Sequence, residues 1–122
     1  MRGDSFLDRM ASASRDRVSL ARARESETAL RARATAVADT PALRLGEFDL
    51  IAELKLRSPA TGSLAEPHFD RDSQINAYAT GGAAVISVLT EPTEFKGTLT
   101  HLREAASILT SAGIPAMRKD FL

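Results

Sequence analysis

Three short apolar runs alternate with two helix-like segments in the second half of the chain, and this alternation constrains the fold most. The runs lie at 50–55, 83–90 and 114–119, and each is typical of a short buried strand. Between them, residues 70–80 and 98–111 place apolar side chains at helical spacing. Strands that alternate with helices in this way predict parallel strands joined by right-handed crossovers. We therefore expect an α/β fold containing a βαβαβ unit.

Glycine and proline mark the segments between these elements. Gly81 and Gly82 follow the first helical segment, and Gly113 follows the second, as glycines commonly do at helix ends. Residues 58–69 contain proline and glycine and are expected to form a loop, as are residues 91–97. None of these glycines belongs to a phosphate-binding fingerprint such as G-x-G-x-x-G.

The N-terminal part differs in composition. Residues 5–38 are rich in alanine and arginine and contain no glycine or proline. Apolar and small residues at three/four spacing predict an amphipathic helix: Phe6, Leu7, Met10, Ser14, Val18 and Ala21. Ser26 is placed to cap a second helix that runs to about Val37, before Thr40-Pro41. The arginines suggest a nucleic-acid surface, but interspersed acidic residues favour an ordinary solvated helix face.

Composition excludes several classes of function. Lysine plus arginine and aspartate plus glutamate number 16 each, which gives no case for nucleic acid or anionic lipid as a partner. Without cysteine there is no disulfide, zinc-thiolate site or thiol nucleophile. No apolar run approaches the roughly 20 residues of a membrane span, and the N-terminus lacks the apolar stretch of a signal peptide. We expect one modest cytoplasmic domain.

Three ionisable residues stand at or near the ends of the first and third apolar runs. Side chains alternate along a strand, so Glu53 and Lys55 share a face with Ile51, and Lys119 shares a face with Met117. If both strands belong to one barrel, Glu53, Lys55 and Lys119 converge on one cavity. A carboxylate between two ammonium groups suits acid and base chemistry on an anionic substrate. An internal ion pair without a catalytic role is an equally good interpretation of the spacing.

Other candidate residues carry weaker signals. His68 and His101 are isolated, and we expect no metal site. Phe95 and Phe121 suit either a core or the aromatic wall of a pocket. Ser58 precedes a proline and is compatible with a simple turn.

Four motifs resemble the indole-3-glycerol phosphate synthase family. Residues 51–59 resemble its first-strand signature I-A-E-x-K-x-x-S-P, and residues 77–91 resemble its next helix and second strand. Phe95 and Gly97, with leucines after them, match a segment F-x-G-(S/T)-x-x-x-L, and residues 118–122 match R-K-D-F-(I/L). The resemblance implies a TIM barrel with a helical N-terminal extension at 1–48 and the first three strands at 49–122.

The resemblance also implies a reaction. The family converts 1-(2-carboxyphenylamino)-1-deoxyribulose 5-phosphate to indole-3-glycerol phosphate in tryptophan biosynthesis, by ring closure, decarboxylation and dehydration, without a cofactor. By position, Lys119 resembles the general acid for ring closure, Glu53 the carboxylate that handles protons in dehydration, and Lys55 a cation that contacts the substrate and shares acid duty. The substrate-binding residues it implies are Ser58 in the active-site loop and the aromatic walls Phe95 and Phe121.

The chain departs from the family pattern in two respects, the number of βα units and one loop sequence. A (β/α)8 barrel has about 250 residues, so only about three βα units fit this chain, and we expect it to be inactive by itself. It is either part of such an enzyme or a non-catalytic half-barrel that pairs with a chain supplying the rest of the barrel. Ala60-Thr61 stands where the family often has S-K, which leaves open a paralogue that acts on a related aminoaryl sugar phosphate.

Overall fold

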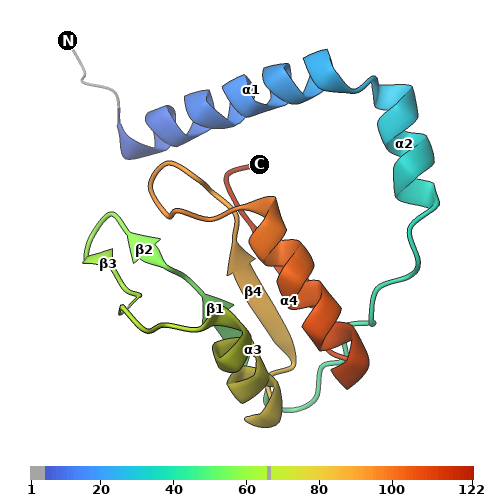
Figure 1. Ribbon diagram of the computed structural model, residues 1–122, viewed down its shortest axis with the longest axis vertical. Helices are drawn as coiled ribbons and strands as arrows, with labels where there is room; N and C mark the ends of the chain where they lie inside the picture. The colour runs from blue at the N-terminus through green and yellow to red at the C-terminus, as the bar shows by residue number, and fades with distance from the viewer. Residues whose placement is uncertain (1–4, 66) are drawn as a thin grey trace. The chain divides into compact units, whose positions relative to one another are not determined.

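The computed structural model describes residues 5–65 and 67–122, and the chain divides into two compact units (Figure 1). The first unit comprises the residues up to Asp39 together with Phe121 and Leu122, and the second comprises Thr40–Asp120. In the described part of the chain, no helix combines the length and apolar character needed to cross a membrane.

Two helices make up the first unit, α1 (Phe6–Arg24) and α2 (Glu27–Thr35). Ser5 and Asp8 form a reciprocal capping box at the start of α1, and the Ser26 hydroxyl accepts a hydrogen bond from the Ala29 N–H at the start of α2. The two predicted helices and the Ser26 cap are therefore confirmed, although α2 ends two residues before Val37. Within α1, Met10 is buried, whereas Leu7, Val18 and Ala21 of the predicted apolar stripe are exposed.

The second unit contains the predicted βαβαβ unit. Strands β1 (Ile51–Leu54), β4 (Val85–Leu89) and β5 (Ala116–Lys119) form a parallel sheet in the order β1-β4-β5. Helices α3 (Arg71–Thr80) and α4 (Leu99–Ala112) connect them and lie side by side against the sheet (Figure 1). The observed strands are shorter than the apolar runs, so Lys55 lies one residue beyond β1.

Polar caps and a glycine define the ends of these helices. Asp70 accepts hydrogen bonds from the N–H groups of Asp72 and Ser73, and Thr98 accepts one from the His101 N–H. Gly113 ends α4 with a φ of 68°, in the left-handed region where glycine is favoured.

The hydrophobic core lies between the sheet and its two helices. Its buried members come from one face of the strands, from the helices and from the turn before β4: Leu54, Ile75, Ala83, Ile86, Val88, Ala105 and Leu109. On the face of β1 opposite Glu53, Leu54 belongs to this core and Ala52 packs against it. Leu50, by contrast, is 52% exposed and precedes β1. The opposite face of the sheet carries Glu53.

One segment differs from its prediction. The region 58–69, expected to be a plain loop, begins with a small antiparallel hairpin of β2 (Arg57–Ser58) and β3 (Gly62–Ser63). Gly62 adopts a φ of 72°, which suits glycine at a tight turn. The prediction of an irregular loop was wrong here because two-residue strands leave no periodic pattern to detect.

Candidate active site

The Glu53 carboxylate lies between two lysine ammonium groups. Its Oε2 atom is 2.8 Å from Lys119 Nζ, and its Oε1 atom is 3.0 Å from Lys55 Nζ. Lys119 ends β5, whereas Glu53 and Lys55 lie at the end of β1, so the cluster joins the carboxyl ends of two strands that do not pair directly. The convergence predicted from strand alternation is confirmed.

The register of the sheet explains how this contact forms across the central strand. Glu53 is opposite Ser87 of β4, and Ser87 is opposite Met117 of β5. Lys119 lies two residues beyond Met117 and therefore on the same face. Ser87, which is 2% exposed, adds a hydroxyl 3.3 Å from Glu53 Oε2. Sequence reasoning did not select Ser87, although it is the one polar residue within the run 85–89.

The cluster is partly open to solvent. The Glu53 and Lys55 side chains are 27% and 30% exposed, and that of Lys119 is 50% exposed. Partial burial acts to raise the pKa of Glu53, but the hydrogen bonds and charges of Lys119 and Lys55 outweigh it and hold this pKa below its ordinary value. Glu53 is therefore ionised at neutral pH and able to accept a proton, and the ammonium groups are placed to donate one.

A tyrosine hydroxyl supports the main chain at Glu53. The Leu50 carbonyl accepts a hydrogen bond from the Ala84 N–H beside β4, so the Glu53 carbonyl, three residues later, faces the other edge of β1. Tyr78 of α3 donates its hydroxyl to that carbonyl at 3.1 Å. The sequence analysis did not select Tyr78 for the site.

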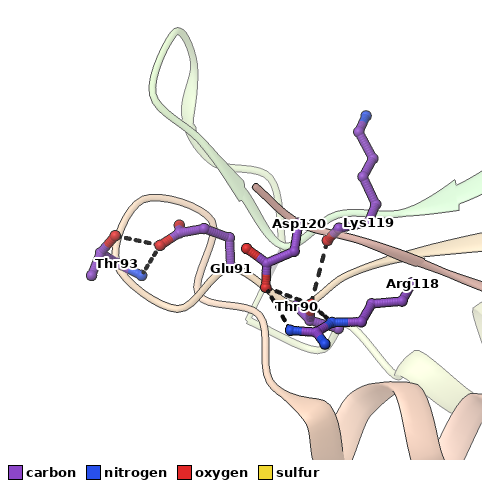
Figure 2. A network of polar contacts seen from close by, with 6 residues as sticks. All are labelled: Thr90, Glu91, Thr93, Arg118, Lys119 and Asp120. Carbon is purple, nitrogen blue, oxygen red and sulfur yellow. Dashed lines mark hydrogen bonds and ion pairs between the residues drawn. The ribbon is translucent and has the colours of Figure 1, made fainter. Parts of the chain in front are cut away.

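Residues at the ends of β4 and β5 form a second group of polar contacts, which Figure 2 shows. Thr90, Arg118 and Asp120 bond to one another, and Lys119 lies between the last two in sequence. Nearby, the buried Glu91 carboxylate accepts hydrogen bonds from the loop that follows β4. The sequence offers little to single out these residues, because each is a polar residue next to a strand end, where solvated side chains are common.

The predicted substrate-binding residues have other partners in the described part of the chain. The Ser58 hydroxyl accepts a hydrogen bond from the Ala60 N–H at 3.2 Å, within the hairpin region. Phe95 is half-buried in the loop 91–97, where its N–H donates to Glu91. Phe121 belongs to the first unit, and its ring meets that of Phe6 edge to face with centroids 6.0 Å apart.

Two other features of the described residues lie apart from this cluster. A shallow groove of about 370 Å³ runs between α3 and α4, and its lining residues are Asp72, Arg103, Glu104, Ser107 and Ile108. None of them is a predicted site residue, and the groove is on the helical side of the sheet. Across residues 5–65 and 67–122, no three potential metal ligands of the His, Cys, Asp or Glu type come together.

Comparisons with known proteins place the chain in one family. The family described as "Indole-3-glycerol phosphate synthase" matches residues 7–122. Proteins of that name from Burkholderia vietnamiensis and Rhizorhabdus wittichii are 39% and 37% identical to this chain over 124 and 125 residues. These alignments cover 96% and 95% of the chain but 46% of each relative. One from Nocardioides sp. is 41% identical over 106 residues, which is 81% of the chain and 39% of the relative.

The chain thus spans less than half the length of these curated relatives and corresponds to their N-terminal portion. The parallel βα units, the helices before them and a family match across 7–122 all lead to one assignment. This chain belongs to the indole-3-glycerol phosphate synthase family.

Proposed function

We propose that Glu53, Lys55 and Lys119 perform acid and base steps of the indole-3-glycerol phosphate synthase reaction within a complete barrel. Lys119 protonates the substrate carbonyl during ring closure, and Glu53 transfers protons during dehydration. Lys55 contacts the anionic groups of the substrate and shares acid duty. The observation that supports this proposal is the Glu53 carboxylate held between two ammonium groups at the carboxyl ends of β1 and β5.

Charge and exposure favour catalysis over a purely structural ion pair. Two ammonium groups and one carboxylate leave the cluster with one net positive charge, which suits a substrate that carries a phosphate and a carboxylate. The Lys119 side chain is 50% exposed, so its ammonium group is accessible to such a substrate. The carboxyl ends of parallel strands are also where barrel enzymes place catalytic residues.

The remaining substrate contacts follow from the family pattern. Phe95 and Phe121 would enclose the anthranilate ring, and Ser58 would contact the substrate from the loop after β1. The hydrogen bond between Phe95 and Glu91 supports a fixed position for the Phe95 main chain.

We further propose that the 122-residue chain is inactive alone and associates with a chain supplying the rest of the barrel. Within the described residues, β1 and β5 each have one unpaired edge. Ile51 and Met117, on the face that a barrel interior would cover, are 61% and 41% exposed. Unpaired edges and exposed apolar groups favour pairing with further strands.

The test is a chimaera in which this chain replaces the matched portion of the Burkholderia vietnamiensis relative. Production of indole-3-glycerol phosphate from the carboxyphenylamino substrate is expected from the chimaera and not from the chain alone. Lys119→Met in the chimaera should lower kcat by about 100-fold or more, because a general acid typically contributes that much.

Arg103→Met is the matched control, since it also removes one cation but lies exposed on α4, outside the cluster. It should leave turnover within about twofold of the parent chimaera. A folded Lys119→Met chimaera that is as active as the Arg103→Met chimaera would refute the role of Lys119, and product formed by the chain alone would refute its inactivity.

A further inference from the structure

A closed ring of hydrogen bonds links Thr90, Arg118 and Asp120 at the ends of β4 and β5 (Figure 2). The Thr90 hydroxyl donates to Asp120 Oδ2 at 2.8 Å and accepts from Arg118 Nε at 3.1 Å. Arg118 also reaches Asp120 Oδ2 directly at 3.3 Å. The Asp120 side chain is 1% exposed and the Arg118 side chain 38% exposed, so the ring is buried at its carboxylate end.

The ring restrains the residues on both sides of Lys119, and Thr90 also holds Lys119 itself. The Thr90 N–H donates to the Lys119 carbonyl at 2.9 Å. Because side chains alternate along β5, restraint of Arg118 and Asp120 directs Lys119 to the opposite side of the strand. Figure 2 shows the Lys119 side chain pointing away from the ring, and its ammonium group meets Glu53 at 2.8 Å.

Lysine needs such an anchor because its side chain is long and flexible. Half of the Lys119 side chain is exposed, so packing does little to fix the ammonium group. Its position depends on the direction in which the main chain presents the side chain and on the Glu53 carboxylate at its far end. A small rotation of the strand end would be amplified over the length of the side chain.

We propose that Thr90 is a positioning residue for Lys119, acting through its hydrogen-bonded ring with Arg118 and Asp120. The consequence for catalysis rests on the proposed function, whereas the positioning itself does not. Thr90 touches neither Glu53 nor the reacting atoms, so its effect would pass entirely through the end of β5. A hydroxyl that only stabilised the fold would leave the Lys119–Glu53 contact unchanged.

The experiment compares Thr90→Val, which keeps the shape but lacks the hydroxyl, with Thr90→Ser, which keeps the hydroxyl. The measurement is the pKa of Glu53 in the 122-residue chain, followed by NMR titration of its side-chain carboxyl carbon. In Thr90→Val this pKa should rise by about half a pH unit, because a displaced Lys119 lowers it less. In Thr90→Ser it should stay within about 0.2 of the parent.

Thr110→Val is the matched control, because it removes a hydroxyl that bonds a main-chain carbonyl within α4, away from β5. It should not alter the titration of Glu53. An unchanged Glu53 pKa in Thr90→Val, or an equal rise in Thr90→Ser, would overturn the proposal. If Thr90→Val does not fold, Arg118→Lys replaces it in the experiment, because this variant keeps the charge but loses the guanidinium geometry. A similar rise in the Glu53 pKa would support the proposal, and an unchanged Glu53 pKa would overturn it.

Turnover of the chimaera separates this inference from the proposed function. Thr90→Val there should lower kcat about tenfold with little change in KM, and Thr90→Ser should restore it. An inactive parent chimaera together with a raised Glu53 pKa would remove the proposed function and leave the positioning intact. If the chimaera is active but Thr90→Val changes neither its kcat nor the Glu53 pKa, the positioning role of Thr90 is refuted and the proposed function stands.

Discussion

Replacing the buried Glu91 with glutamine tests whether one carboxylate organises the loop that carries Phe95. Glu91 is fully buried, and its carboxylate accepts hydrogen bonds from the N–H groups of Thr93, Glu94 and Phe95 at 2.9, 2.7 and 3.2 Å. The Thr93 hydroxyl bonds to the same carboxylate (Figure 2). The Glu91 carbonyl also accepts from the Gly97 N–H at 2.8 Å, which closes the loop.

The expected loss follows from these contacts. Each carboxylate oxygen accepts two hydrogen bonds, and glutamine replaces one oxygen with an amide nitrogen that cannot accept any. Two hydrogen bonds to a charged group are lost, at about 1.5 to 3 kcal/mol each. Because Thr93 is exposed and water can replace part of this loss, we take the lower end and expect Glu91→Gln to reduce the free energy of unfolding by about 3 kcal/mol.

The free energy of unfolding would be measured by urea titration of the 122-residue chain at pH 7. Amide hydrogen exchange of Glu94 and Phe95 would report the loop directly, and both should lose protection in Glu91→Gln. Glu94→Gln is the control, because it removes the same charge from the same loop without touching the buried carboxylate. Glu94→Gln should change the free energy of unfolding by less than about 0.5 kcal/mol.

The pH dependence gives a second check with a definite sign. Burial acts to raise the pKa of Glu91, but the hydrogen bonds from Thr93, Glu94 and Phe95 outweigh it and hold this pKa below its ordinary value of 4.5. Stability from a lowered carboxyl pKa is complete above the unfolded value and is lost as pH falls through the folded value. The difference in free energy of unfolding between the parent and Glu91→Gln should therefore become smaller below pH 4.5.

A free energy of unfolding of Glu91→Gln within about 0.5 kcal/mol of the parent value, with unchanged protection of the loop amides, would contradict this role of Glu91. A difference in free energy of unfolding that does not change with pH in the acid range would contradict it as well. Either result would show that the carboxylate occupies the loop without stabilising it.

Three further substitutions test other contacts. Gly97→Ala would place a Cβ atom 2.1 Å from the Leu89 carbonyl oxygen, so it should lower the free energy of unfolding in urea by about 2 kcal/mol or more. Lys119→Met should raise the pKa of Glu53 toward its ordinary value, as measured by NMR titration, because the ion pair at 2.8 Å is lost. Tyr78→Phe should lower the free energy of unfolding by about 1 kcal/mol, measured in urea, because the Glu53 carbonyl loses its donor.

Each of these substitutions has a matched control. Gly46→Ala adds the same methyl group where nothing lies within 4 Å, and equal stability of the two alanine variants would contradict the steric argument. Arg103→Met should leave the pKa of Glu53 unchanged, and an equal rise would point to a long-range charge effect. Thr110→Val removes an exposed hydroxyl-to-carbonyl hydrogen bond, so it should affect stability less than Tyr78→Phe does. The reverse order would show that the Tyr78 hydroxyl does not stabilise β1.

Much of the fold could be predicted because its signals are local. Ser26, Asp70 and Thr98 stand where helices begin, since a short polar side chain bonds the free N–H groups of the first turn. Alternation along β1 placed Glu53 and Leu54 on opposite faces, which the structure confirms. The β2–β3 hairpin escaped prediction because each strand has two residues and forms only by pairing with the other.

The parts of the site that could not be predicted depend on contacts distant in sequence. Glu91 is a charged residue in a loop, and nothing in its neighbours reveals that its carboxylate is buried against three later N–H groups. Thr90 and Asp120 are 30 residues apart, and only strand pairing brings them together. The Tyr78 hydroxyl similarly crosses from a helix to the main chain of β1, 25 residues away.

The order of strands and helices, the helix caps and the faces that carry charge follow from side-chain chemistry within a few residues, so the amino-acid sequence indicates them directly. Motifs in a fixed order likewise indicate the family. Which atoms meet depends on the tertiary structure. The register of β1, β4 and β5 sets Glu53 between Lys55 and Lys119, and a register is fixed by the packing of the whole sheet rather than by any one strand.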